Sequence, residues 1–281
     1  MRWVIIGCAG QLGAEFLDLL NDAAIGLPRE KADLTRPFDL EDFLLAESPV
    51  GVINCAAFNH VDKAEDKPYD AFAINAWGVR DLASLCFRLN IQLVHFSTDH
   101  VFSGQKFSPW FENDPTFPAN LYGFSKLSGE MWARSINPKT MVVRTCGLYG
   151  DKGRGGKGTN FVATIQKLAK SNDSLSIVND QICNPSSARD VAKATIQLMD
   201  PFVPGVYHLA NSGACSWYTF AKTILEFSGQ SVHVQPISSS QFGARAKRPQ
   251  FSVLGSLRQG TRDYPVMRPW QESLAEYLKI G

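Results

Sequence analysis

The chain lacks the features that mark secreted, membrane-spanning or metal-binding proteins. Its six cysteines are scattered over 281 residues without a C-x-x-C pair, which argues against a disulfide framework or a zinc site. The histidines show no metal-ligand spacing. No run approaches the roughly 20 apolar residues of a membrane helix, and the short apolar start leads into a glycine turn instead of a signal-peptide core. We therefore expect a cytoplasmic protein with no metal site and no membrane contact.

The chain also has no excess of charge of either sign. It carries 28 Lys and Arg against 27 Asp and Glu, a net charge of +1, and no long basic stripe. Electrostatics therefore gives no reason to expect nucleic acid or an anionic membrane as a partner. With 44% hydrophobic residues, the chain can bury a large core and can form one α/β domain with a smaller appendage.

Short apolar segments of β type alternate with helical patterns through the first two-thirds of the chain. Such alternation is typical of a parallel sheet covered by helices on both faces. The expected strands are residues 3–6, 24–27, 50–55, 92–96, 141–144 and 175–178, and the expected helices are 11–20, 40–46, 70–89, 122–135 and 161–170. The sequence thus predicts an α/β fold of Rossmann type, with a doubly wound parallel sheet.

A glycine-rich turn follows the first expected strand and opens the first expected helix. Gly7, Gly10 and Gly13 are spaced G-x-x-G-x-x-G, in the strand-turn-helix context of a dinucleotide fingerprint. The free N–H groups and the dipole at the start of such a helix bind pyrophosphate, and glycine lets it come close. Glycines in a tight turn can also serve the backbone alone. The spacing and the position favour cofactor binding.

Tyr122 and Lys126 are four residues apart in an expected helix, so that their side chains share one face. The ammonium of Lys126 would then lie beside the phenol of Tyr122 and lower its pKa, which is ordinarily about 10. A phenol adjusted toward neutral pH can pass a proton to or from a carbonyl oxygen. Such a pair also occurs by chance on surface helices. Together with the glycine turn, it indicates nicotinamide-dependent carbonyl or alcohol chemistry.

The pattern becomes irregular past about residue 171. A helix is expected at 189–199, a strand at 205–209 and a helix at 218–228, followed by a Pro- and Ser-rich passage at 236–249. We interpret residues 1–170 as an NAD(P)-binding Rossmann domain. Residues 171–281 are interpreted as a smaller C-terminal substrate-binding lobe, with segments of the two interleaved.

Further motifs follow in order along the whole chain. They are GQLG at 10–13, DLT at 33–35, NCAA at 54–57, VDKAE at 61–65, STD at 97–99, PANLYGFSKLSGE at 118–130, RT at 144–145, NF at 160–161, VNDQ at 178–181 and RP at 248–249. This set resembles the extended short-chain dehydrogenase/reductase superfamily. More narrowly, it is similar to the dTDP-4-dehydrorhamnose reductase family, whose step yields dTDP-L-rhamnose.

The resemblance implies a reaction and the residues that carry it. The catalytic trio would be Thr98, Tyr122 and Lys126, with Thr98 in the place that serine holds in many superfamily members. Hydride from reduced nicotinamide would attack the C4 ketone of a dTDP-4-keto-6-deoxy sugar while Tyr122 delivers a proton to the oxygen. Thr98 would donate a hydrogen bond to that oxygen, and Lys126 would hold the ribose hydroxyls.

The remaining implied contacts fall into two sets. The cofactor would be bound by Gly7, Gly10, Gln11, Leu12, Asp33, Leu34, Ala56 and Ala57, together with Tyr122 and Lys126. The substrate, a nucleotide sugar, would be bound by Thr98, His100, Gly147, Asn160, Gln181 and Arg248.

Arg29 bears on the choice of cofactor. An arginine near the end of the second strand can bind the 2′-phosphate of NADPH, whereas an acid there binds the 2′-hydroxyl of NADH. Arg29 favours NADPH, although a solvated turn of Arg29, Glu30 and Lys31 would leave NADH equally acceptable.

Two positions depart from the family pattern. The family usually has tyrosine after Ser-Thr-Asp and tryptophan two residues after Arg-Thr, both lining the sugar pocket, and this chain has His100 and Gly147. The loss of two aromatic surfaces predicts a roomier, more polar site for another nucleotide-linked 4-keto sugar. If neighbouring residues compensate, the usual substrate still fits.

Some alternatives stay open at this point. Residues 151–159 are rich in glycine and cations but lack the Gly-Lys-[Ser/Thr] ending of a P-loop, and they suit a flap near the diphosphate or an ordinary surface loop. The chain could also be a nucleotide-sugar epimerase or dehydratase that recycles its nicotinamide, or a non-catalytic NADP-binding regulatory subunit. Both a monomer and a homodimer are compatible with the sequence.

Overall fold

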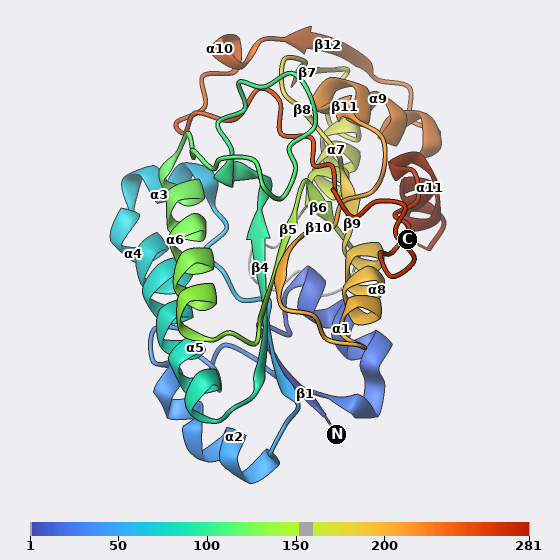
Figure 1. Ribbon diagram of the computed structural model, residues 1–281. Helices are drawn as coiled ribbons and strands as arrows, with labels where there is room; N and C mark the ends of the chain where they lie inside the picture. The colour runs from blue at the N-terminus through green and yellow to red at the C-terminus, as the bar shows by residue number, and fades with distance from the viewer. Residues whose placement is uncertain (1, 152–159, 281) are drawn as a thin grey trace.

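The computed structural model describes residues 2–151 and 160–280. Six strands form the central sheet in the order β10-β5-β4-β3-β1-β2, and all neighbours are parallel (Figure 1). They span Trp3–Ile6 (β1), Ala24–Leu27 (β2), Gly51–Asn54 (β3), Gln92–Thr98 (β4), Thr140–Thr145 (β5) and Gly205–His208 (β10). The expected doubly wound parallel sheet is confirmed.

Uninterrupted apolar sequence in the strands supplies a core on each face of the sheet. Side chains along a strand point alternately to opposite faces. In β1, Trp3 and Ile5 belong to one buried cluster, and Val4 and Ile6 belong to the other. The sheet is therefore covered on both sides, as the continuous apolar runs of a parallel sheet require.

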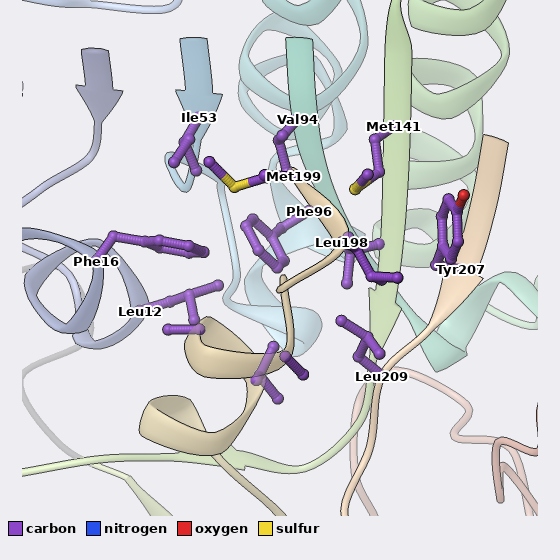
Figure 2. Close-up of a cluster of buried hydrophobic side chains, with 14 of the residues drawn as sticks. Leu12, Phe16, Ile53, Val94, Phe96, Met141, Leu198, Met199, Tyr207 and Leu209 are labelled. Atoms are coloured by element: carbon purple, nitrogen blue, oxygen red, sulfur yellow. The ribbon is translucent and has the colours of Figure 1, made fainter. Parts of the chain in front are cut away.

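Helices α1 (Gln11–Leu20) and α8 (Ala188–Leu198) cover the first face. Figure 2 shows Leu12 and Phe16 of α1 packed toward Ile53, Val94 and other strand residues of this cluster. Residues at positions i and i+4 of a helix share a face, which is why these two side chains enter the same core.

The opposite face is covered by α2 (Glu41–Glu47), α5 (Gly78–Arg88) and α6 (Leu121–Ile136). Val79, Leu82 and Leu85 of α5 are fully buried there. The helix expected at 70–89 is interrupted: α4 (Pro68–Phe72) leads into a π-helical turn at Ala73–Trp77 before α5 begins. A short helix, α3 (Val61–Asp66), precedes it.

A smaller lobe lies over the carboxyl ends of the central strands (Figure 1). Its helices are α7 (Phe161–Ala169), α9 (Trp217–Phe227), α10 (Ser239–Phe242) and α11 (Trp270–Ile280). Its strands form three pairs: β7 (Ser174–Val178) with β12 (His233–Ile237), β8 (Ile182–Cys183) with β11 (Cys215–Ser216), and β6 (Leu148–Tyr149) with β9 (Ser186–Ser187). Phe220 is the centre of its core, stacked on Phe161 with ring centroids 5.6 Å apart.

The structure corrects the placement of two expected strands. Residues 175–178 form part of β7, which pairs with β12 outside the central sheet, and β10 takes the edge position beside β5 instead. Apolar alternation predicts a strand but does not identify its partner, which is the reason for the error. The division of the chain at residue 170 stays a proposal. Helix α8 and strand β10 lie in the larger layer although they follow that residue, so the segments interleave.

Neither a membrane-crossing helix nor a metal-binding cluster is present in the described part of the chain. No helix within residues 2–151 and 160–280 is long and apolar enough to cross a membrane. In the same ranges, no group of three or more His, Cys, Asp or Glu is placed to hold a metal ion. The flap proposed for residues 151–159 lies outside the described part of the chain, apart from Asp151.

The direction of the strand order reverses between β1 and β3. These strands are neighbours, but β1 leads into α1 on one face, and β3 leads toward the helices of the other face. Ligands of doubly wound sheets bind at the carboxyl ends of the strands where the order reverses in this way. The glycine turn after β1 and the segment 54–57 after β3 both lie there.

One buried ion pair ties α6 to the sheet. Nη2 of Arg144, on β5, donates to Oε2 of Glu130 on α6 at 2.7 Å, and Nε donates to Oε1 at 3.0 Å. Their side chains are 5% and 2% exposed, and Ser97 of β4 also donates to Glu130. Since α6 carries Tyr122 and Lys126, the pair fixes their helix against two central strands.

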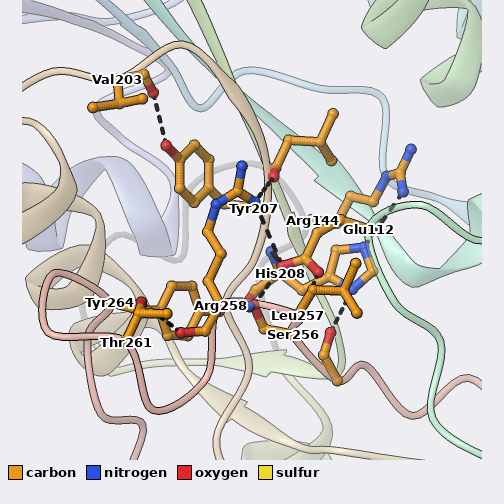
Figure 3. Close-up of polar contacts among 12 residues, drawn as sticks. Glu112, Arg144, Val203, Tyr207, His208, Ser256, Leu257, Arg258, Thr261 and Tyr264 are labelled. Atoms are coloured by element: carbon orange, nitrogen blue, oxygen red, sulfur yellow. Dashed lines mark hydrogen bonds and ion pairs between the residues drawn. The ribbon is translucent and has the colours of Figure 1, made fainter.

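His208 extends this network to the edge strand β10. Its Nε2 lies 3.3 Å from Nη1 of Arg144 (Figure 3). Its Nδ1 lies 2.8 Å from the carbonyl oxygen of Gly255. The carbonyl can only accept, so that Nδ1 carries the proton and Nε2 accepts from Arg144. Burial, together with the charge of Arg144, lowers the pKa of His208 to about 4. The ring is therefore neutral at neutral pH.

We predict that Arg144→Met destabilises the fold strongly, because it leaves the buried carboxylate of Glu130 without its cation. The free energy of unfolding should fall by about 3–5 kcal/mol, as measured by urea denaturation. The matched control is Arg36→Met. Arg36 pairs with Asp39, and their side chains are 72% and 71% exposed, so its loss should cost less than about 1 kcal/mol. Equal losses in the two variants would contradict the structural role of the buried pair.

Candidate active site

A cavity of about 560 Å³ opens at the carboxyl ends of the central strands. Its wall on the sheet side includes Thr98, Tyr122 and Lys126, and the start of α1 forms another part. The smaller lobe closes it from the opposite side with residues of β7, β8 and α9. The cavity therefore lies between the two layers, with the predicted catalytic trio in one wall.

The predicted residues divide into those that line the cavity and those that do not. The lining includes all six predicted substrate residues: Thr98, His100, Gly147, Asn160, Gln181 and Arg248. Among the predicted cofactor residues, it includes Gly10, Gln11, Leu12, Ala57, Tyr122 and Lys126. Gly7 and Ala56 lie behind them in contact with each other, and Leu34 is buried in the core.

Gly7 cannot carry a side chain. Its φ of +76° is in the left-handed region, and a Cβ atom would lie 2.7 Å from the backbone nitrogen of Ala56. A Cβ on Gly13 would lie 2.4 Å from the carbonyl oxygen of Gly7. The turn, the start of α1 and the end of β3 are thus packed backbone to backbone. This close packing holds the N-terminus of α1 at the floor of the cavity, where Gly10 provides no side chain to cap it.

Asp33 and Arg29 lie near each other beyond β2. The carboxylate of Asp33 accepts from the backbone N–H and the hydroxyl of Thr35, both at 2.9 Å. These hydrogen bonds, with smaller contributions from Arg29 and Arg36, lower the pKa of Asp33. Asp33 and Arg29, the two candidates for binding the 2′ position of the ribose, therefore both follow β2. The side chain of Arg29 is exposed.

The environment of Tyr122 and Lys126 differs from the expectation. Burial raises the pKa of Tyr122, a hydrogen bond with Thr98 opposes the rise, and the carboxylate of Asp99 adds to it. The expected lowering of the Tyr122 pKa is therefore wrong. The shared helix face borders the cavity, where Tyr122 is half-buried and Lys126 is buried. The ammonium of Lys126 donates to the carbonyl oxygen of Phe96 at 2.6 Å.

Lys126 is itself strongly affected by burial. It is 3% exposed, and desolvation lowers its pKa to about 8, against the opposing effects of Glu130 and Cys55. A free lysine has a pKa of about 10.4. The ammonium of Lys126 therefore loses its proton just above neutral pH.

Asp99 is a site residue whose role was not predicted from the sequence. Its Oδ1 accepts from the hydroxyl of Thr98 at 2.9 Å, and its Oδ2 accepts from the thiol of Cys146 at 3.0 Å. The Thr98 oxygen in turn accepts from the backbone N–H of His100 at 3.2 Å. Asp99 thus orients the Thr98 hydroxyl. Its position directly after Thr98 in the Ser-Thr-Asp motif at 97–99 was the available signal.

The family described as RmlD substrate binding domain matches residues 1–281.

The chain belongs to this family.

Individual relatives agree with the family match. A dTDP-4-dehydrorhamnose reductase of Mycolicibacterium smegmatis is 36% identical over 281 residues, which cover 98% of this chain and 84% of that protein. The crystal structure of a dTDP-4-dehydrorhamnose reductase from Clostridium acetobutylicum is 37% identical, with a TM-score of 0.95 and coverage of 100% of this chain and 99% of that one. The structure of the Bacillus anthracis dTDP-4-dehydrorhamnose reductase in complex with NADP is 33% identical, with a TM-score of 0.95 and the same coverage. The resemblance inferred from the motifs is confirmed.

Gly147, one of the two departures from the RmlD family pattern, lies beside an aromatic residue of the smaller lobe. Its φ is +53°, and a Cβ atom would lie 3.1 Å from Cα of Pro185 and 3.5 Å from Cη2 of Trp217. Trp217 is the first residue of α9, lines the cavity and packs on Phe161 with ring centroids 4.6 Å apart. An aromatic wall is therefore present beside residue 147, supplied by the smaller lobe. A side chain at 147 would be strained.

His100, the second departure, is held by other residues of the RmlD-type site. Its ring lies edge-on to Tyr122, with ring centroids 5.5 Å apart and planes at 79°. Nδ2 of Asn120 lies 3.0 Å from its Nδ1. The imidazole thus occupies the cavity wall directly beside the phenol.

Two other predicted substrate residues make hydrogen bonds that stabilise the smaller lobe. Asn160 caps α7 by accepting from the N–H of Ala163, and its amide donates to the carbonyl of Gly150 at 2.7 Å. Gln181 donates to the hydroxyl of Ser239 at 2.8 Å. These contacts fix two segments of the cavity wall in the smaller lobe.

Arg248 spans the two layers. It makes two hydrogen bonds to the carboxylate of Asp62 on α3, at 2.8 and 2.6 Å, and this pairing lowers the pKa of Asp62 to about 2. The loop that follows α10 is thereby tied to the helix after β3. Asp62 was not assigned this role from the sequence, because ion-pair partners 186 residues apart have no local signal.

We predict that NADPH affinity falls as the pH rises through the pKa of Lys126. A lowered pKa means that the amine loses its proton at a lower pH, and the neutral amine no longer attracts the ribose hydroxyls as an ammonium does. The Kd for NADPH, from fluorescence titration, should increase about tenfold between pH 7 and pH 9. Lys126→Met should bind NADPH weakly and with no dependence on pH in this range. A constant Kd for the wild type would remove Lys126 from cofactor binding.

Proposed function

We propose that the chain is an NADPH-dependent reductase that converts the C4 ketone of dTDP-4-dehydrorhamnose to the alcohol of dTDP-L-rhamnose. The observation that carries this proposal is that Thr98, Tyr122 and Lys126 line one cavity together with the start of α1. Reduction of a carbonyl by a nicotinamide cofactor requires a proton donor, a hydroxyl that can hydrogen-bond to the carbonyl oxygen, and a turn that binds the dinucleotide. The family match supports the substrate class.

The residues present fit a dinucleotide. The packed glycine turn leaves the N–H groups of α1 directed at the cavity floor without a side-chain cap. Within the described residues, Oγ1 of Thr145 is buried in the cavity wall and has no hydrogen-bond partner. A buried hydroxyl of this kind calls for a ligand atom, since unpaired polar groups are costly in a protein interior. Register places Thr145 opposite Thr98.

Specific residues would hold each part of the cofactor. Gly7, Gly10 and Gln11 would hold the pyrophosphate, and Lys126 would hold the ribose beside the nicotinamide. Arg29 would pair with the 2′-phosphate. The reduced nicotinamide supplies the hydride for the ketone carbon.

Three residues of the chain take part in the transfer of a proton to the ketone oxygen. The raised pKa of Tyr122 keeps the phenol protonated at working pH, so it is ready to donate to the ketone oxygen. The positive charge of Lys126 stabilises the phenolate as the proton leaves. The Thr98 hydroxyl donates to Asp99 in this structure, and rotation about Cβ–Oγ1 would turn that proton toward the substrate oxygen.

The sugar would bind against the wall from the smaller lobe. Trp217 lies on Phe161 and faces the cavity, and an aromatic face gives a sugar ring a large rigid contact. Because Trp217 provides this surface beside Gly147, the departure at 147 gives no reason to assign a different sugar. We therefore retain dTDP-4-dehydrorhamnose as the substrate.

We predict that the purified protein oxidises NADPH only when a dTDP-linked 4-keto sugar is present, and that Tyr122→Phe lowers kcat about 10²–10⁴-fold by removing the proton donor. Initial rates from absorbance at the NADPH band provide the measurement. Tyr69→Phe is the matched control, since that tyrosine is 89% exposed. NADPH binding without turnover on any keto sugar would favour a regulatory subunit. Conversion of a sugar without net NADPH consumption would favour an epimerase or dehydratase.

We predict that Arg29→Ala weakens the binding of NADPH much more than the binding of NADH, because only NADPH offers a 2′-phosphate. A hydrogen bond between charged groups contributes about 1.5–3 kcal/mol, so the Kd for NADPH should rise about 10- to 150-fold. Lys31→Ala, an exposed cation two residues away, should change either Kd less than about threefold. Equal effects of Arg29→Ala on both cofactors would place Arg29 outside the site.

A further inference from the structure

Phe242 is an exposed aromatic residue in the wall of the cavity. It is 56% exposed, and it lines the same cavity as Tyr122 and Thr98. Among the described residues, it belongs to none of the buried hydrophobic clusters. A single exposed phenylalanine on an outer surface is ordinary and needs no explanation. This ring, however, lies in a cavity that would hold a ligand, so that its exposed face is available to that ligand.

The short helix α10 holds the backbone of Phe242 in a fixed place. The carboxylate of Asp180 accepts from the backbone N–H of Ser239 at 2.9 Å and from its hydroxyl at 2.6 Å. Ser238 caps the same end of the helix in a capping box. Directly after Phe242, Gly243 ends the helix with a φ of +64°. The backbone that carries the ring is therefore already ordered, which lowers the entropic cost of binding a ligand there.

The segment that follows α10 connects Phe242 to the catalytic wall. The carbonyl oxygen of Lys247 accepts at 2.8 Å from the amide of Asn120, the N-cap of the helix that carries Tyr122. The next residue, Arg248, lines the cavity. Figure 1 shows α10 at the end of the smaller lobe that is remote from the central strands. The cavity wall therefore leads from Tyr122 past Arg248 to Phe242.

This order matches the order of the groups in a nucleotide sugar. The ketone must lie at Tyr122 and Thr98 to receive a proton. A diphosphate separates the sugar from the nucleoside, and the guanidinium of Arg248 is a cation that can bind it. The start of α1, at another part of the wall, is taken by the cofactor in the proposed function. The base of the substrate therefore belongs beyond Arg248, where Phe242 offers an aromatic face.

We propose that Phe242 is the surface on which the base of the substrate's nucleotide stacks. Base and ring bind face to face, and because every base has such a face, the contact provides affinity without selecting one base. The inference rests on the reductase function proposed above, which supplies a nucleotide sugar as the substrate. It adds a substrate-binding residue at the opposite end of the cavity from the reacting ketone.

Titration of the full-length protein with dTDP tests the proposal by calorimetry. The protein is first saturated with NADPH, so that dTDP can bind only outside the cofactor site. Phe242→Ala should raise the Kd for dTDP about 5- to 150-fold, the range that loss of an aromatic stacking partner produces. Phe242→Tyr retains an aromatic face and should stay within about threefold of the wild type. An equally large loss in Phe242→Tyr would overturn the proposal, because the ring would still be present.

Phe87→Ala is the matched control. Phe87 is 55% exposed, which is close to the exposure of Phe242, but it lies on α5 and is not among the residues that line the cavity. Its loss should leave the Kd for dTDP unchanged. Thermal unfolding should show that both alanine variants keep the fold, since neither side chain is buried.

Inorganic pyrophosphate serves as a ligand without a base. Its Kd should be the same for the wild type and Phe242→Ala, because the phenyl ring carries no charge. For the same reason, the factor by which Phe242→Ala weakens dTDP binding should not change between low and high salt. If pyrophosphate binding weakens as much as dTDP binding, the substitution has disturbed the diphosphate site near Arg248, and the proposed stacking is wrong.

The titration also separates failure of this inference from failure of the proposed function. If the wild type binds dTDP and Phe242→Ala binds it equally well, Phe242 does not contact the base, and the proposed function is unaffected. If the wild type saturated with NADPH does not bind dTDP, the proposed function itself is contradicted, and the inference fails with it.

Discussion

The buried pair of Glu130 and Arg144 is the interaction on which the site depends. Taking two charges out of water is costly, and their mutual hydrogen bonds, together with those from Ser97 to Glu130 and from Arg144 to His208, offset that cost. The pair therefore leaves little freedom in how α6 lies against β5. Because Lys126 is one turn from Glu130 on the same helix, that constraint also determines where the ammonium lies. The chemistry of the site thus rests on a contact that does not touch the cavity.

Burial then sets the charge states of the two main catalytic candidates in opposite directions. It disfavours the phenolate of Tyr122, so its pKa rises, and it disfavours the ammonium of Lys126, so its pKa falls to about 8. Two groups whose ordinary pKa values lie close together, at 10.0 and 10.5, are thus shifted in opposite directions, which suits a proton donor and a neighbouring cation. Asp99 contributes through Thr98, whose hydroxyl it orients.

The cavity wall is formed partly by the layer that contains the central sheet and partly by the smaller lobe. Gly147 adopts a conformation that favours glycine, and the ring of Trp217 from α9 fills the space beside it. Arg248 and Asp62 connect the same two layers on another side. The position of each layer is consequently set by contacts with the other, and the aromatic surface follows from this packing and not from the residue at a single position.

The sequence by itself determined the local parts of this protein. The limits of α1, β1 and β2 agree with the periodicity, because a helix or a buried strand needs only neighbours along the chain to be recognised. The tertiary structure decided everything that depends on distant partners. It placed β10 and not β7 in the central sheet, raised the pKa of Tyr122, and brought Trp217 to Gly147. Partner choice and desolvation are properties of the packed chain, and a linear pattern carries no measure of either.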